Sequence, residues 1–145
     1  MIEKLKLLFA VLLAYRHNLH MLHWKVVGKS FDKAHTILDD YVSQFNIFID
    51  EIAEMILSMG HNPLTLQESI SLLDNLDTHI LMVESHEDYE CKEVFKAVDI
   101  MFTDLYTMYD SISRDMGGDC GSKLDEHKYW LRIEGMYKNK KRLID

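Results

Sequence analysis

Apolar residues recur along most of this chain at the spacing of an α-helix. Near the N-terminus, Leu5, Leu8, Leu12, Tyr15 and Leu19 follow one another at intervals of three or four residues. Such intervals place side chains on one face of a helix. No alternating apolar and polar pattern of useful length indicates a β-strand. The pattern therefore predicts an all-α fold.

Glycine and proline positions divide this periodic sequence into four long predicted helices. Gly28 ends the first helix, Ser30 is the expected N-cap of the second, and Gly60 with Pro63 ends the second. The four helices are predicted over 2–27, 30–59, 86–114 and 122–142, with a break at 116–121. A crossover over 62–78 carries a short helix at 66–73. Two helical hairpins joined by a long crossover describe a ferritin-like four-helix bundle, expected here as one domain over 1–145.

Composition and charge exclude several classes of protein. Apolar residues make up 48% of the 145 residues, which argues against disorder. The net charge of −8 excludes a global basic field for nucleic acid and suits the attraction of cations. The apolar run over 7–15 is too short to span a bilayer, so we expect it to belong to a core helix and expect no membrane partner. Cys91 and Cys120 lack zinc-type spacing, and a chain of this size needs no disulfide, so a reducing cytoplasm is expected.

The second predicted helix carries a stripe of residues of the types that bind metals. His35 and Asp39 form one pair at i, i+4, and Asp50 and Glu54 form another. At 100° per residue these four side chains fall within about 100° of one another and point away from the apolar stripe of the helix. Asp39 and Asp50 are roughly 16 Å apart along a straight helix. One metal ion cannot bridge that distance, because its ligands lie about 2 Å from it. Within one chain the two pairs are therefore separate half-sites.

A second copy of the chain would complete both half-sites. Asp39 and Asp50 are equally far from a point midway between positions 44 and 45, and so are His35 and Glu54. An antiparallel partner helix then places Asp39 opposite the partner's Asp50 and His35 opposite the partner's Glu54, as an isologous two-fold contact requires. His23, on the first helix, is predicted to lie level with His35 across the hairpin. Two imidazoles and up to three carboxylates suit iron with open coordination positions.

These same residues carry a family resemblance that covers most of the chain, most strongly residues 18–63. The matching motif is His23-Trp24-Lys25-Val26-Val27-Gly28-Lys29-Ser30-Phe31, then Ala34-His35, Asp39 and Asp50-Glu51-Ile52-Ala53-Glu54. This long and specific motif resembles the signature of the Dps proteins, the DNA-binding proteins from starved cells, which are also called mini-ferritins. The segment over 126–132 resembles the last helix of that family.

The resemblance implies a ferroxidase that protects against oxidative damage. It implies a hollow dodecamer with dinuclear or mononuclear iron sites at the two-fold interfaces. Iron(II) would be oxidised there, by hydrogen peroxide in preference to oxygen, and iron(III) stored as mineral. The ligands implied by position are His23, His35, Asp39, Asp50 and Glu54. Trp24 matches the family's tryptophan beside the site, which can intercept oxidising equivalents; a simply packed aromatic is the alternative.

Two departures from the family pattern bear on these expectations. Met55 follows Ala53-Glu54 where the family usually has arginine, so a nearby ion pair is expected to be absent. The region over 114–130 is shorter than is typical of the family, which forms its three-fold iron-entry pores there. No pore is assigned, although four carboxylates could line one: Asp115, Asp119, Asp125 and Glu126.

Three other functions are weighed against the ferroxidase. A nucleoid-associated DNA-binding protein would use the basic cluster over 138–142, but lysines there also suit a helix C-terminus, so DNA binding is expected to be weak. A diiron bundle with its site inside one chain is expected to carry Glu-x-x-His motifs, and the sequence contains none. A purely structural bundle leaves the matched ligand stripe unexplained.

Overall fold

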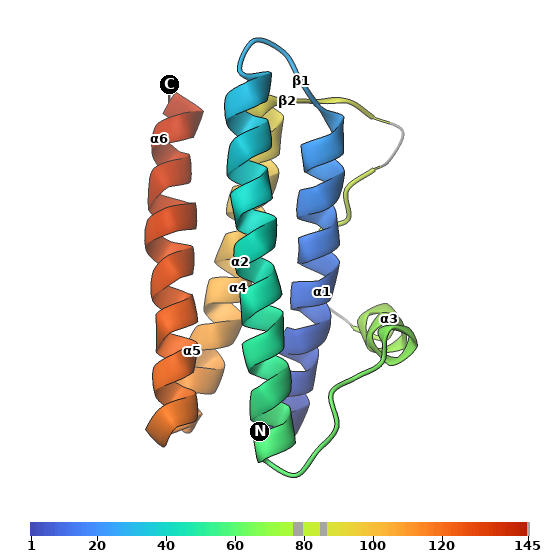
Figure 1. The fold of residues 1–145 in the computed structure, drawn as a ribbon, viewed down its shortest axis with the longest axis vertical. Coiled ribbons are helices and arrows are strands. Elements are labelled where there is room, and N and C mark those ends of the chain that lie inside the picture. Colours follow the sequence, from blue (N-terminus) through green and yellow to red (C-terminus); the bar gives the residue numbers. More distant parts are fainter. Residues whose placement is uncertain (77–79, 85–86, 145) are drawn as a thin grey trace.

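The computed structural model describes residues 1–76, 80–84 and 87–144. Four helical columns lie side by side (Figure 1). They are α1 (Ile2–Lys25), α2 (Phe31–Ser58), α4 (Cys91–Asp115) and a continuous fourth column of α5 (Gly118–Trp130), the π-helix η1 (Leu131–Tyr137) and α6 (Lys138–Ile144). The short helix α3 (Leu66–Asp74) follows α2 and lies outside the bundle, against α1. The predicted all-α, ferritin-like bundle with a short crossover helix is confirmed.

The core lies between the four columns. Leu8, Leu12 and Tyr15 are completely buried, so the apolar N-terminal run is part of a core helix, as predicted. Phe31, the first residue of α2, lies outside the core: it is 39% exposed and its ring stacks on His35. In the part of the chain that the structure describes, no helix is long and apolar enough to cross a bilayer.

The α1–α2 turn differs from the prediction by a small piece of sheet. The sequence predicts that the first helix runs to residue 27 and stops at Gly28, where φ is +107°. However, α1 stops at Lys25, and β1 (Val26–Val27) pairs in parallel with β2 (Tyr89–Glu90). Two-residue strands are too short to produce an alternating pattern, so the sequence could not predict them. Their pairing holds the start of α4 against the α1–α2 turn.

Two further boundaries differ from the prediction. Residue 86, the predicted start of the third long helix, and residue 78, the predicted end of the crossover, lie outside the described residues. Helix α4 itself begins at Cys91, directly after β2. The predicted break at 116–121 is too long, because α5 begins at Gly118, where φ is +67°. A Cβ on Gly121 would lie 2.6 Å from the Met116 carbonyl oxygen, so this glycine permits the tight turn.

The π-helix in the fourth column was not predicted. A π-helical turn leaves backbone groups without their usual partners. Here the Tyr41 hydroxyl donates a hydrogen bond of 2.9 Å to the Glu134 carbonyl oxygen. Gly135 packs against the ring of buried Phe102, which leaves no room for a Cβ at this position. The π-helix thus allows a close approach between η1 and α4.

Candidate metal centre

The structure brings His23 of α1 and His35 of α2 together. Their rings stack with centroids 3.6 Å apart and an interplanar angle of 25°. Nδ1 of His35 lies 3.1 Å from the carbonyl oxygen of His23. A carbonyl can only accept, so Nδ1 carries the proton and Nε2 of His35 keeps its lone pair. A ring oriented by its other nitrogen in this way is typical of metal-binding histidines.

Asp39 completes this first half-site. Its Oδ1 lies 3.9 Å from Nε2 of His23, one turn of α2 beyond His35. Nδ1 of His23 is buried and has no hydrogen-bond partner among the described residues. Burial, and then the nearby ring of His35, lowers the pKa of His23 below its ordinary value, and Asp39 opposes this only in part. A neutral imidazole is the form that binds metals.

Asp50 and Glu54 form the second half-site further along α2. Both side chains are exposed and make no hydrogen bond or ion pair with any described part of the chain. Within the described residues of one copy, no three His, Cys, Asp or Glu side chains gather closely enough to hold a metal ion. The five predicted ligands therefore lie in two incomplete groups, and the roles assigned to them remain predictions.

Trp24 lies beside the first half-site but is not a core residue. Its side chain is 59% exposed in a single copy of the chain, so it does not pack in that copy's own core. The His20 ring stacks on the indole, with centroids 5.2 Å apart and an angle of 10°. The His20 ring also lies 6.4 Å from that of His23. The indole is thus both close to the half-site and open to solvent.

Sequence reasoning missed a second polar cluster, between α2 and the fourth column. His127 is buried, and its Nδ1 lies 2.8 Å from the buried Tyr109 hydroxyl. Nε2 of His127 lies 3.5 Å from Oε1 of Glu51, and Lys123 lies 2.8 Å from Oε2 of the same carboxylate. Burial lowers the pKa of His127 to about 4, against the opposing charge of Glu51. These residues come from three helices, so no spacing within one helix could have indicated them.

Comparison with known proteins bears on the identity of the fold and the motif. No family model matches the chain. The chain is 31% identical over 97 residues to the DNA protection during starvation protein of Helicobacter pylori, an alignment that spans 66% of this chain and 63% of that relative. The protein of the same name from Streptococcus suis is 23% identical over 124 residues, which is 80% of this chain and 72% of that protein.

Solved structures share the whole architecture. Antigen TpF1 from Treponema pallidum matches with a TM-score of 0.87 and 21% identity, over 98% of this chain and 90% of that one. A Dps protein from Bacillus brevis matches with a TM-score of 0.85 and 22% identity, over 98% and 93% of the two chains. The chain is therefore similar to Dps proteins in sequence over part of its length and in fold over nearly all of it.

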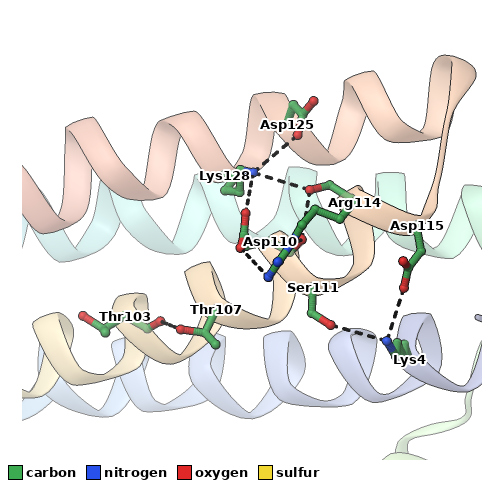
Figure 2. A network of polar contacts seen from close by, with 10 residues as sticks. Lys4, Thr103, Thr107, Asp110, Ser111, Arg114, Asp115, Asp125 and Lys128 are labelled. Carbon is green, nitrogen blue, oxygen red and sulfur yellow. Dashed lines mark hydrogen bonds and ion pairs between the residues drawn. The ribbon is translucent and has the colours of Figure 1, made fainter.

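The two departures from the Dps sequence pattern can now be located in the structure. Met55 is a buried core residue, 6% exposed, so an apolar side chain takes the place of the family's usual arginine. Three of the four candidate pore carboxylates have cationic partners: Asp115 with Lys4 at 3.4 Å, Asp125 with Lys128 at 3.7 Å, and Glu126 with Lys123 at 3.8 Å. Figure 2 shows the first two pairs. It also shows Lys128 of α5 beside Asp110 of α4, at 3.0 Å, a contact that joins these two helices. These partners reduce the local negative charge, and no pore is assigned.

The C-terminal basic cluster is partly occupied by contacts within the fold. Arg142 donates hydrogen bonds to the Tyr41 hydroxyl at 2.5 Å and to Asn139 at 2.7 Å. Lys138 pairs with Glu134 at 2.6 Å. Few cations therefore remain for a nucleic acid phosphate backbone.

Proposed function

We propose that this chain is a Dps-type ferroxidase subunit of a hollow shell that stores iron, built as a dodecamer from two-fold dimers. Two groups of side chains on α2 carry the proposal. His35 and Asp39 lie close to His23 of α1. Asp50 and Glu54 are exposed further along α2. Each group lacks the ligands that the other would supply across a two-fold axis. The names of the relatives, which protect DNA during starvation, agree with a protective role.

The five residues have distinct roles in this proposal. His23 binds iron(II) as a neutral imidazole, because burial and the adjacent His35 ring lower its pKa. His35 binds through Nε2, since its Nδ1 faces the carbonyl oxygen of His23. Asp39 adds a carboxylate from the same copy, and the partner's Asp50 and the partner's Glu54 complete the set. This mixture of imidazole and carboxylate ligands suits iron and leaves coordination positions for an oxidant.

Iron is the substrate of the proposed reaction, and hydrogen peroxide is the preferred oxidant. Two iron(II) ions each lose one electron, and one hydrogen peroxide takes up these two electrons and two protons to give two waters. Where only one iron(II) ion is bound, Trp24 can supply the second electron, since its indole lies beside the half-site and is solvent-exposed. The iron(III) formed is stored as mineral. We place the protein in a reducing cytoplasm, in keeping with the free thiols of Cys91 and Cys120.

Iron oxidation tests this proposal. Iron(II) is added without oxygen, then hydrogen peroxide or air, while the absorbance of iron(III) and its solubility are followed. We expect faster oxidation with peroxide, and soluble product. The double variant His35→Ala, Glu54→Ala should lose this activity, whereas the control His61→Ala, Glu93→Ala, which removes an exposed histidine and an exposed glutamate elsewhere, should keep it. Equal rates for wild type and the His35, Glu54 variant would refute the proposal.

A further inference from the structure

A second polar site lies between α2 and the fourth column. Glu51 directly follows Asp50, but its side chain points about 100° further around α2 than Asp50 and about 60° further than Glu54. It faces Lys123 and His127 of the fourth column. It lines a cavity of about 280 Å³ together with Glu126, His127 and Glu134. Three carboxylates and one imidazole therefore share this cavity with apolar neighbours such as Phe48 and Trp130.

His127 is the residue that indicates a ligand for this cavity. Its side chain is only 2% exposed, and the ring is fixed by stacking on Phe48 with centroids 4.1 Å apart. Nδ1 is satisfied by the Tyr109 hydroxyl at 2.8 Å, but Nε2 is buried and makes no hydrogen bond within the described chain. An unpaired polar atom in the interior is costly, so such an atom calls for a partner.

The distance between His127 and Glu51 fits a bridging metal ion better than a hydrogen bond. Nε2 and Oε1 are 3.5 Å apart. An N–H···O hydrogen bond is usually about 2.7–3.2 Å long. Two ligands about 2.1 Å from a tetrahedral ion, in contrast, lie roughly 3.4 Å from each other. The observed separation is close to that second value.

We propose that His127 Nε2 and Glu51 Oε1 bind a divalent transition-metal ion, with water in the remaining positions. Nitrogen and carboxylate ligands suit zinc, iron(II) or manganese(II). The Tyr109 hydroxyl oxygen would accept a hydrogen bond from Nδ1–H of His127. This bond would hold Nε2 toward the metal, as outer-shell partners of metal-binding histidines do. This site is separate from the proposed ferroxidase centre, and it does not depend on that function.

Lys123 provides a sharp test, because it already neutralises the same carboxylate. Its ammonium lies 2.8 Å from Oε2 of Glu51, beside the oxygen that would bind the metal. Two cations close to one carboxylate repel each other, so removing the lysine charge should strengthen metal binding. If His127 and Glu51 were only a structural pair, losing Lys123 would have no reason to increase affinity for a metal.

Zinc binding to the intact chain, measured by titration calorimetry, tests the site. The background carries His35→Ala and Glu54→Ala, which remove two of the five ligands from each proposed ferroxidase site. We expect one zinc per chain. Glu51→Gln and His127→Gln should each weaken it by at least about tenfold, Tyr109→Phe by about 10–100-fold, and Lys123→Met should tighten it. The control His61→Gln should leave binding unchanged.

Two results would overturn the site. One is zinc binding that Glu51→Gln leaves unchanged. The other is zinc binding that Lys123→Met leaves unchanged or weakens. Thermal unfolding of each variant shows whether it is folded. If His127→Gln does not fold, Glu51→Gln and Lys123→Met decide the outcome, because both alter a partly exposed side chain at the rim of the cluster.

Discussion

The hydroxyl of Tyr109 lies 2.8 Å from Nδ1 of His127 in the interior of the bundle. Both side chains are buried, and Tyr109 is completely inaccessible to solvent. Burial is the main cause that lowers the pKa of His127 to about 4 and raises that of Tyr109 well above its ordinary value. Both residues are therefore neutral in the folded protein at physiological pH. A neutral buried histidine makes the stability of the fold depend on pH.

The first prediction follows from this pKa. The ordinary value of 6.5 applies to the unfolded chain, so as pH falls the unfolded chain takes up the proton first. Stability is therefore fully present above about pH 7, falls between 6.5 and about 4, and levels off below that. Between pH 7.5 and 5 the loss should be about 2 kcal/mol.

Unfolding of metal-free protein by urea at several pH values, at one protein concentration, measures this dependence. His127→Gln should remove the part of the slope that lies between pH 6.5 and 4, because glutamine does not titrate. An unchanged slope in this variant would show that other groups cause the acid sensitivity.

The second prediction concerns the π-helix. A Cβ on Gly135 would lie 1.8 Å from Cδ2 of Phe102, a distance that real atoms do not reach. Gly135→Ala should therefore destabilise the fold by about 1–3 kcal/mol, despite the better helix propensity of alanine. In a Phe102→Leu background the same substitution should cost much less. Thermal unfolding of the four proteins in this double-mutant cycle checks the contact, and additive effects would contradict it.

Much of the fold could be predicted because helical periodicity is a property of the sequence itself. Leu5, Leu8 and Leu12 lie on one apolar face, which becomes buried when the helix packs against its neighbours. Gly28 and Gly60, both with positive φ, follow closely after the ends of the first two helices. The β1–β2 pair and the π-helix depend instead on contacts between distant segments. Gly135 shows this best, because only the ring of Phe102 explains its lack of a side chain.

The candidate site was predictable to a similar extent. Helix geometry predicts the i, i+4 pairs on α2 and places His23 opposite His35 across the α1–α2 hairpin. The rings of His23 and His35 stack, so these two residues are close together as predicted. The cluster of Glu51 and His127 was not predictable. These residues lie on different helices, and only the packing of α2 against the fourth column brings them within 3.5 Å.

The third prediction is weak DNA binding at physiological salt. Each chain carries a net charge of −8, and Arg142 and Lys138 are engaged within the fold. Affinity for DNA depends on how many phosphates a protein neutralises, so the remaining exposed lysines give little. A gel-shift assay checks this, and tight complexes that resist salt would contradict it.

If residual DNA binding is seen, Lys140→Glu with Lys141→Glu should abolish it. Charge reversal is a better test than deletion of the C-terminal segment, because deletion would also remove buried Asn139 and the packed Arg142. Thermal unfolding of the double variant shows whether it remains folded, which separates loss of charge from loss of fold.

The central claim is that each ferroxidase site is shared between two copies, and a mixing experiment tests it most directly. His35→Ala and Glu54→Ala are each prepared alone, and both should oxidise iron poorly because every site lacks one ligand. The two are then denatured together and refolded. In a mixed dimer one site combines both lesions, whereas the other takes its unaltered half from each chain.

The control mixture combines His35→Ala with Asp39→Ala. These lesions lie in the same half-site, so every site keeps one lesion in any pairing and no activity should return. Random pairing of His35→Ala with Glu54→Ala should restore about one quarter of all sites. The measurement is the rate of iron(II) oxidation by peroxide in refolded particles shown to contain both variants. Recovery near one quarter in the test mixture, with none in the control, is the predicted result; no recovery in the test mixture would contradict the shared site.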